Sequence, residues 1–432
     1  MSRVDSKREG NVASINSLWK TLLGVEQVVV EDWNFEEEEG QLVITLRPVF
    51  GARDRCSICG RRAPKYDRGG GRRRWRSLDF GTVEVLIEAE SPRVACREHG
   101  VVVASVPWAR PLSKFTSAFQ DQCAWLAVHT SRSATAELMR VAWRSVGRMV
   151  DVVGAEARKR VDLLTDLRRI GIDEVSYRKG HKYLTVVVDH DTGRLVWLEA
   201  GRDEATVRRF FDALGPVRCM ELALVSADGA AWISSVVTER APQAIQCLDP
   251  FHVVQWATKA LDEVRREVWN DLRTGGDDDR AKHLKNARWA LWKNPENLTT
   301  RQRETLGWIP KVNQSLYRAY LLKEALRTVF HAPSLNAARH RLAAWLAWSR
   351  RSQLRPFVKL ARTIREYLPR INAALEHRLT NARVEATNTQ IRLLTRIAHG
   401  FRHTSALIGL AMLKLAGLCP PLPGRPVPTT SS

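Results

Sequence analysis

The sequence contains no run of about 18 apolar residues, so no segment is expected to cross a membrane. Its first ten residues, MSRVDSKREG, lack the apolar stretch that a secretory signal needs. Cysteine is scarce: the chain has seven in 432 residues, an odd number that argues against a disulfide framework. These absences exclude an integral membrane protein and a small disulfide-stabilised secreted protein, and they predict a protein of the reducing cytoplasm.

Acidic residues are in the minority, with 47 Asp and Glu against 68 Lys and Arg, and the net charge is +21. Such a surplus favours a nucleic-acid partner, because each neutralised phosphate releases counterions; the alternative is a basic enzyme with a solvated surface. The charge is uneven. Residues 1–50 hold 5 basic and 9 acidic side chains, whereas residues 341–432 hold 15 basic and 3 acidic. The C-terminal portion is therefore expected to contact DNA phosphates, and the N-terminal segment is not.

Residues 1–112 are predicted to be rich in strands and loops. Val28–Val30 and Leu42–Ile44 flank the acidic turn Glu36–Gly40, which indicates a hairpin, and Val83–Ile87 is a further strand. This segment also holds the clustered cysteines.

Residues 113–160 are predicted to be helical. Ser133 is expected to cap one short helix and Ser145 the next, so the two form a helix-turn-helix whose second helix reads DNA. The alternative is that these helices are plain core.

Residues 168–250 change character and follow the order β-β-β-α-β-α-β, with helices at Glu204–Leu214 and Ala230–Arg240. The expected strands are Arg169–Val175, Tyr183–Val188, Leu195–Leu198, Leu222–Ser226 and Ala244–Leu248. A three-strand meander followed by right-handed crossovers is the order of ribonuclease H-like folds, in which the first and fourth strands are neighbours. Residues 251–418 are predicted to be helical, and the proline-rich tail at 419–432 is predicted to be disordered.

Two short pairs of soft ligands, Cys56–Cys59 and Cys96–His99, are separated by 36 residues. Four such side chains suit one tetrahedral zinc ion with a structural role, since no open coordination position is implied. The alternative is four unrelated side chains in a reduced protein.

Four arginines lie between these pairs, at Arg72, Arg73, Arg74 and Arg76, around a tryptophan in a glycine-rich stretch. We predict a flexible cationic loop that contacts phosphates or the minor groove, the alternative being a solvated loop. In the second helix of the helix-turn-helix, Arg144 and Arg148 are the candidates for DNA contact.

Three carboxylates stand out by their placement. Asp173 lies within the first strand of the meander and Asp228 just after the fourth strand, so the two are expected to meet at one edge of the sheet. Glu385 is one of only three acids in the basic C-terminal stretch. Buried carboxylates require a cation, and two Mg²⁺ (or Mn²⁺) ions could activate water and stabilise the leaving oxygen. The alternative is that each acid is a helix cap or lies on the surface.

Asp249-Pro250-Phe251-His252 follows the fifth strand. Asp249 is predicted to cap the next helix, and His252 either approaches the site or packs on the sheet.

Several blocks resemble bacterial insertion-sequence transposases of the ISL-three family. Gly171–Glu174 with Lys179–Tyr183 is similar to the first-acid block, and Ser226–Gly229 with Asp249–His252 to the second. Thr380–Asn388 resembles the third and continues into His399-Gly400-Phe401-Arg402, where the family signature has an aromatic residue in place of His399. The finger and helix-turn-helix have the same order in that family, so the resemblance covers about residues 50 to 424.

The resemblance implies an α/β fold: a ribonuclease H-like catalytic core at 168–418, interrupted by a helical insertion at about 258–370 and preceded by the zinc-binding domain and helix-turn-helix. It implies a cytoplasmic bacterial Asp-Asp-Glu transposase that binds the terminal inverted repeats of an insertion sequence. Asp173, Asp228 and Glu385 would hold the metals for strand cleavage and transfer. Double-stranded DNA would be the partner, with at least a dimer on paired ends. The alternatives are a domesticated DNA-binding regulator without catalysis and a nuclease that cuts but does not join.

Overall fold

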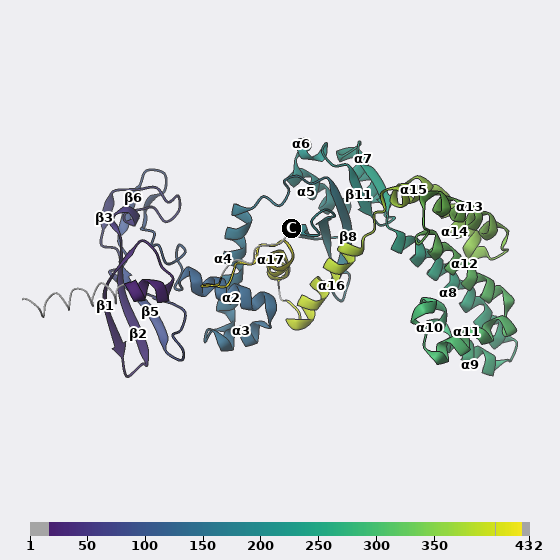
Figure 1. Ribbon diagram of the computed structural model, residues 1–432, viewed down its shortest axis with the longest axis horizontal. Coiled ribbons are helices and arrows are strands. Elements are labelled where there is room, and N and C mark those ends of the chain that lie inside the picture. Colours follow the sequence, from purple (N-terminus) through teal and green to yellow (C-terminus); the bar gives the residue numbers. More distant parts are fainter. Residues whose placement is uncertain (1–16, 402, 426–432) are drawn as a thin grey trace, which may run out of the picture. The chain divides into compact units, whose positions relative to one another are not determined.

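The computed structural model describes residues 17–401 and 403–425, which form two compact units (Figure 1). The first unit contains the described residues up to Val161 and those from Ile397 onwards, and the second unit is Asp162–Arg396. No helix within the described ranges is long and apolar enough to cross a membrane.

The N-terminal part of the first unit consists of two small sheets. The larger has the order β1-β2-β5-β4, and the smaller has the order β3-β6-β7. Their bounds are β1 (Val28–Glu36), β2 (Gln41–Pro48), β3 (Lys65–Asp67), β4 (Arg72–Arg76), β5 (Glu84–Glu90), β6 (Arg93–Cys96) and β7 (Gly100–Val103), with a 3-10 turn, η1, at Phe50–Ala52. The predicted hairpin is confirmed as the antiparallel pair β1–β2. Alternating apolar residues of these strands, such as Ile44 and Ile87, pack around the buried Trp75 and Trp108.

Three helices follow: α2 (Ser117–His129), α3 (Arg132–Leu138) and α4 (Trp143–Arg160). The predicted caps are wrong in position. Ser131 caps α3, its hydroxyl accepting from the backbone N–H of Ala134 at 3.1 Å, and α4 begins at Trp143 without a side-chain cap. Helix α3 begins one residue before Ser133, and the N-cap position of α4 is Ala142, which has no side-chain acceptor.

Helix α17 (Thr404–Leu415) packs against α4 and α2, where the side chain of Leu413 lies over Gly154. The sequence groups this helix with the segment 168–418, but it belongs to the first unit. Of the predicted tail, residues 419–425 form turns and irregular chain without helix or strand, and residues 426–432 lie outside the described residues.

The second unit contains a five-stranded sheet with the order β10-β9-β8-β11-β12. Its strands are β8 (Arg169–Arg178), β9 (Lys182–Asp189), β10 (Leu195–Ala200), β11 (Leu224–Ala227) and β12 (Ile245–Leu248). The first and fourth strands are parallel neighbours, with Gly171 opposite Ser226, as the sequence predicts. The β-β-β-α-β-α-β order is also confirmed, with a short added helix, α6 (Pro216–Cys219), after α5.

Different helices pack on the two faces of this sheet. Helices α5 (Glu204–Leu214) and α7 (Ala231–Arg240) pack on one face, against Ile170 and Ile172 of β8. Successive strand residues point to opposite faces, so Gly171 and Asp173 face the other side. There, α16 (Ala382–Ile397) lies so close that a Cβ atom on Gly171 would be 2.5 Å from Cγ2 of Val384.

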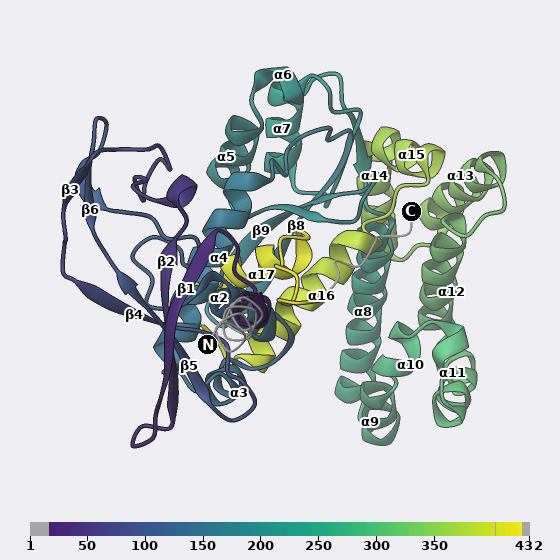
Figure 2. The same cartoon turned by 60° about the vertical axis from the view of Figure 1, so that its left-hand side comes forward.

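A helical segment joins β12 to α16 and has a core of its own, around residues such as Leu261, Leu322, Trp345 and Phe357 (Figure 2). Its helices are α8 (Pro250–Thr274), α9 (Asp278–Asn286), α10 (Arg288–Trp292), α11 (Thr300–Val312), α12 (Gln314–Val329), α13 (Leu335–Arg351), α14 (Arg355–Glu366) and α15 (Leu368–His377), with a 3-10 turn, η2, at Pro295–Asn297. The helical character predicted for this stretch is confirmed.

Candidate active site, zinc site and DNA-contacting residues

Asp173 lies on β8, on the face of the sheet that α16 covers. One carboxylate oxygen accepts from the backbone N–H of Glu174, and the other accepts from the side-chain amide of Asn388, both at 2.8 Å. Burial raises the pKa of Asp173, and the charges of Asp228 and Asp249 raise it further. These contacts hold the Asp173 carboxylate in one orientation within a partly desolvated site.

Asp228 follows β11 in a turn that the helical segment clamps. The Asp228 carboxylate accepts from the N–H of Ala230 at 2.9 Å, and the hydroxyl of Tyr367 donates to the carbonyl of Gly229 at 2.8 Å. A Cβ atom on Gly229 would lie 2.6 Å from the ring of Trp256, so only glycine fits beneath this tryptophan. Residues of α8 and of the α14–α15 junction thus fix the position of Asp228.

Glu385 lies in the first turn of α16, three residues before Asn388, so both side chains point from the same face of the helix. Burial raises the pKa of Glu385, and the charges of Asp249 and Asp173 add to the shift. Sequence reasoning missed Asn388, although its helical spacing from Glu385 marks it as part of the same face.

Glu174, next to Asp173 on β8, was also missed. Burial and the charge of Asp228 raise the pKa of Glu174 to about 7, against the opposing charge of Arg202 at 3.5 Å. Oε1 of Glu174 and Oδ1 of Asn388 are both buried without a hydrogen-bond partner among the described residues. Asp173 and Glu385, whose pKa values are raised by burial and by neighbouring negative charge, are carboxylates of the kind that a hard divalent cation prefers as ligands. Among the described residues, the side chains that lie close enough together to hold a metal ion are Cys56, Cys59, Cys96 and His99, and the three predicted acids are not among them.

Asp249 and His252 form a pair beside these acids. The buried Asp249 caps α8, as predicted, by accepting from the N–H of Phe251, and its other oxygen lies 3.0 Å from Nδ1 of His252. Burial opposes protonation of His252, but the hydrogen bond to Asp249 and the charges of Asp249 and Asp173 raise its pKa above the usual value. The His252 imidazole therefore lies where the charges of Asp249 and Asp173 favour its protonated form.

A buried chain of hydrogen bonds holds the start of α16 to the sheet. Ser226 of β11 donates to Oδ1 of Asn381, and Nε2 of His190 lies 2.7 Å from the Ser226 hydroxyl oxygen. The backbone N–H of Asn381 then donates to Asp249 at 3.3 Å. Residues from β9, β11, β12 and the segment before α16 thereby position the helix that carries Glu385.

Cys56, Cys59, Cys96 and His99 converge, and their ligand atoms all lie within 4.8 Å of one another. The thiols of Cys59 and Cys96 are 3.8 Å apart, close to the ~3.8 Å edge of a tetrahedron with ~2.3 Å zinc–sulfur bonds. The backbone N–H of Cys59 lowers the pKa of Cys56, which favours the thiolate. The four side chains fit zinc in a closed structural site.

The predicted cationic loop is wrong: Arg72–Arg76 is the edge strand β4. Its side chains are engaged within the sheet, because Arg74 pairs with both Glu36 and Glu88, which raise its pKa, and Arg72 also pairs with Glu88. Arg76 pairs with Asp79 and Glu84. Arg73 donates to the carbonyl of Ser113, and its guanidinium lies over Trp75. Acids of other strands, Glu36 and Glu88 among them, therefore neutralise charges of β4, and their positions beside it cannot be read from sequence spacing.

Arg144 and Arg148 are exposed on α4, on the side opposite the buried Val146, Met149 and Val150. Their spacing of four residues places them on one face of the helix. Within the described residues they have no ion-pair partner, whereas Arg72, Arg74 and Arg76 of β4 each have at least one.

Three family profiles match the chain in succession. The zinc-finger of transposase IS204/IS1001/IS1096/IS1165 matches residues 52–99, the helix-turn-helix domain of transposase family ISL3 matches residues 104–152, and the ISL3 transposase domain matches residues 170–410.

Curated relatives cover most of the chain. The transposase for insertion sequence element IS1557 of Mycobacterium tuberculosis, in strains CDC 1551 and H37Rv, is 52% identical over 432 residues, with 94% of this chain and 97% of the relative covered. The transposase for IS1001 of Bordetella parapertussis is 27% identical over 388 residues, covering 89% and 94%. The chain carries a zinc ribbon, a DNA-binding helix-turn-helix and an Asp-Asp-Glu catalytic domain in the family's order, and it belongs to the insertion-sequence transposases of family ISL3.

Proposed function

We propose that Asp173, Asp228 and Glu385 hold the two Mg²⁺ (or Mn²⁺) ions with which this transposase cuts and joins DNA. The observation that carries the assignment is the placement of the acids: Asp173 lies on β8, Asp228 follows the parallel neighbour β11, and Glu385 lies in the first turn of α16, which packs on the face of the sheet that Asp173 occupies. Burial and then neighbouring negative charges raise the pKa of Asp173 and of Glu385. A desolvated group of like charges is costly unless a cation joins it.

The second unit is proposed as a ribonuclease H-like core in which the helical segment from about 258 to 370 is an insertion. The strand order β10-β9-β8-β11-β12, with parallel β8 and β11, supports this fold. The insertion has a structural task, since Trp256 and Tyr367 hold the turn that carries Asp228. Residues 1–112 are proposed as the zinc-binding region and 113–160 as the helix-turn-helix segment.

The reaction has two steps. Water attacks the phosphodiester at the element's end and frees a 3′-hydroxyl, which then attacks a phosphodiester of the target DNA in line and displaces its 3′ oxygen. Bound metal would supply the activation of the attacking oxygen and the stabilisation of the leaving one. Asn388 and the N–H of Glu174 orient Asp173, and His252 lies beside the site in a hydrogen bond with Asp249.

The ends would be read by α4 through Arg144 and Arg148, and the basic C-terminal portion would add phosphate contacts without sequence choice. The zinc held by Cys56, Cys59, Cys96 and His99 would stabilise the ribbon. Pairing of two ends would require at least a dimer on double-stranded DNA.

The test is an assay with labelled element ends, comparing wild type with Asp173→Asn, Asp228→Asn and Glu385→Gln. Each variant should bind the end as wild type does but lose cutting by more than about 1,000-fold in Mg²⁺, because an anionic ligand is lost. Asp212→Asn is the matched control, since this exposed residue pairs only with Arg240 at the surface. A site variant that cuts at the wild-type rate would mean that its residue is misassigned. Binding without cutting by wild type would instead indicate a DNA-binding regulator, and cutting without joining a nuclease.

A further inference from the structure

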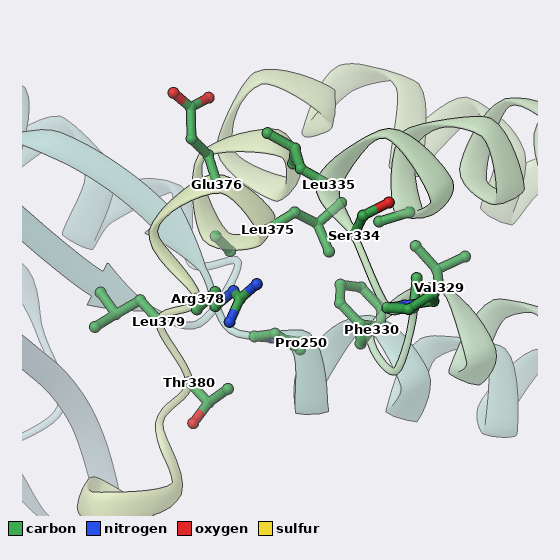
Figure 3. A pocket seen from close by; sticks show the side chains of 14 residues that line it. Pro250, Val329, Phe330, Ser334, Leu335, Leu375, Glu376, Arg378, Leu379 and Thr380 are labelled. Carbon is green, nitrogen blue, oxygen red and sulfur yellow. The ribbon is translucent and has the colours of Figure 1, made fainter.

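A pocket of about 420 Å³ lies in the second unit, where the helical segment meets the chain that leads into α16 (Figure 3). Its walls come from the start of α8, the turn between α12 and α13, and the segment between α15 and α16. Pockets of roughly 300–1,000 Å³ are the size that holds small organic ligands. The second unit therefore has room for a molecule of nucleotide size.

Arg378 supplies the free charge of this pocket. Its side chain is exposed and has no hydrogen-bond or ion-pair partner within the described part of the chain. Its backbone is left-handed, with φ of 49°, a conformation that costs energy for a residue with a side chain. Figure 3 shows Arg378 and Phe330 extending into the pocket from different walls, while Glu376 points away.

The acid of the pocket is already neutralised. Glu376 pairs with Arg339 of α13 at 3.0 Å, so it does not compete for Arg378. The pocket thus combines an unpaired guanidinium, an aromatic ring and the hydroxyl residues Ser334 and Thr380. A guanidinium recognises phosphate through two parallel hydrogen bonds, and an aromatic ring supports a base.

Two segments that line the pocket continue directly into Asp249 and into the residue that donates a hydrogen bond to Asp249. Pro250 lines the pocket and follows Asp249, and Thr380 lines the pocket and precedes Asn381, whose N–H donates to Asp249. Neighbouring Cα atoms are 3.8 Å apart, so the pocket wall begins one residue from this hydrogen bond.

We infer that this pocket receives one unstacked nucleotide of the DNA strand adjoining the phosphodiester that is cut, with Arg378 on its phosphate and Phe330 beside its base. The inference rests on the proposed function, because it takes the neighbouring acids as the cutting site. Withdrawing the nucleotide from the stack would draw the strand toward the acids and hold the end in register.

The test uses the full-length zinc-bound protein and a duplex of its own element end, with 2-aminopurine placed singly at each nucleotide near the cut. The fluorescence of 2-aminopurine rises when the base unstacks, and buffer without Mg²⁺ keeps this signal independent of cutting. Arg378→Gln removes the charge with little change of size. Arg362→Gln is the matched control, because Arg362 is an exposed arginine of α14 that does not line the pocket.

Wild type and Arg362→Gln should brighten one or two positions beside the cut, and Arg378→Gln should lose at least half of that rise. In Mg²⁺, Arg378→Gln should cut roughly tenfold more slowly, and an abasic nucleotide at the brightened position should restore most of the rate, because no base has to be withdrawn. If Arg378 had only a structural role, the abasic nucleotide would not restore the cutting rate of Arg378→Gln. If wild type cuts the duplex but brightens no position, or if Arg378→Gln behaves like Arg362→Gln, the inference is overturned while the proposed function stands. If wild type cuts no element end, both are overturned.

Discussion

Acid should destabilise the catalytic unit through a single buried histidine. His190 is 6% exposed, and burial together with the charges of Arg383 and Arg169 lowers its pKa to about 4. Because the Ser226 hydroxyl donates to Asn381, His190 must donate its Nε2–H to Ser226, so protonation would add a proton at Nδ1. In the unfolded chain the same side chain takes up a proton near pH 6.5.

The unfolded state therefore binds more protons between these two values, and stability falls as the pH is lowered through them. With pKa values of about 6.5 unfolded and about 4 folded, the loss is about 2 kcal/mol at pH 5 and about 3 kcal/mol at pH 4. Above pH 6.5 the neutral histidine imposes no such penalty.

The measurement compares wild type with His190→Gln, whose amide N–H can replace Nε2–H in the bond to Ser226. Urea unfolding is followed at pH 7, 5 and 4, and the two proteins are compared at each pH, so that zinc release and the titration of the carboxylates cancel. Wild type should lose about 2 kcal/mol more than the variant between pH 7 and pH 5. Parallel losses in both proteins would refute the argument and show that His190 is protonated equally in the folded and unfolded states.

Three further outcomes are expected. Gly229→Ala should lower strand cutting by at least about tenfold while end binding persists, because its Cβ would displace Trp256 and move the turn holding Asp228; a Gly307→Ala control, whose Cβ would meet nothing within 4 Å, should cut normally. Elemental analysis should find about one zinc per chain, and Cys59→Ser should lose it and lower the melting temperature of the first unit; a folded, active, zinc-free wild type would contradict this. Arg144→Ala and Arg148→Ala should each weaken binding to the element's end by about 1–3 kcal/mol in a titration, with a smaller effect on random DNA if they contact base edges; equal losses on both DNAs would assign them to phosphates.

Local pattern alone predicts much of this protein. Short strand-like runs separated by turns and helices identify the five strands of the catalytic sheet and the β1–β2 hairpin, because a strand buried on both faces is apolar along its length. The order of these strands predicts that Asp173 and Asp228 lie on adjacent strands, since right-handed crossovers leave few alternatives. The paired spacing of Cys56, Cys59, Cys96 and His99 identifies the side chains that suit zinc, because two ligands only three residues apart can reach the same ion.

Other features depend on partners that are remote in the chain. The run Arg72–Arg76 resembles a free cationic loop until Glu36, Glu84 and Glu88 are aligned beside it by strand register. Helix α17 continues the helical C-terminal segment in sequence, yet its apolar surface is buried against α4 and α2. Neither outcome follows from local composition, because strand register and helix docking are decided by contacts between distant segments.

The candidate site divides in the same way. The sequence by itself predicted the three acids and the strands and helix that carry or precede them, because each lies in a short motif with a definite local structure. Only the tertiary structure brought Asn388 to Asp173, Trp256 and Tyr367 to the turn of Asp228, and the His190–Ser226–Asn381 chain behind α16. These residues come from segments up to 215 positions apart, and their hydrogen bonds form only when burial removes the competing water.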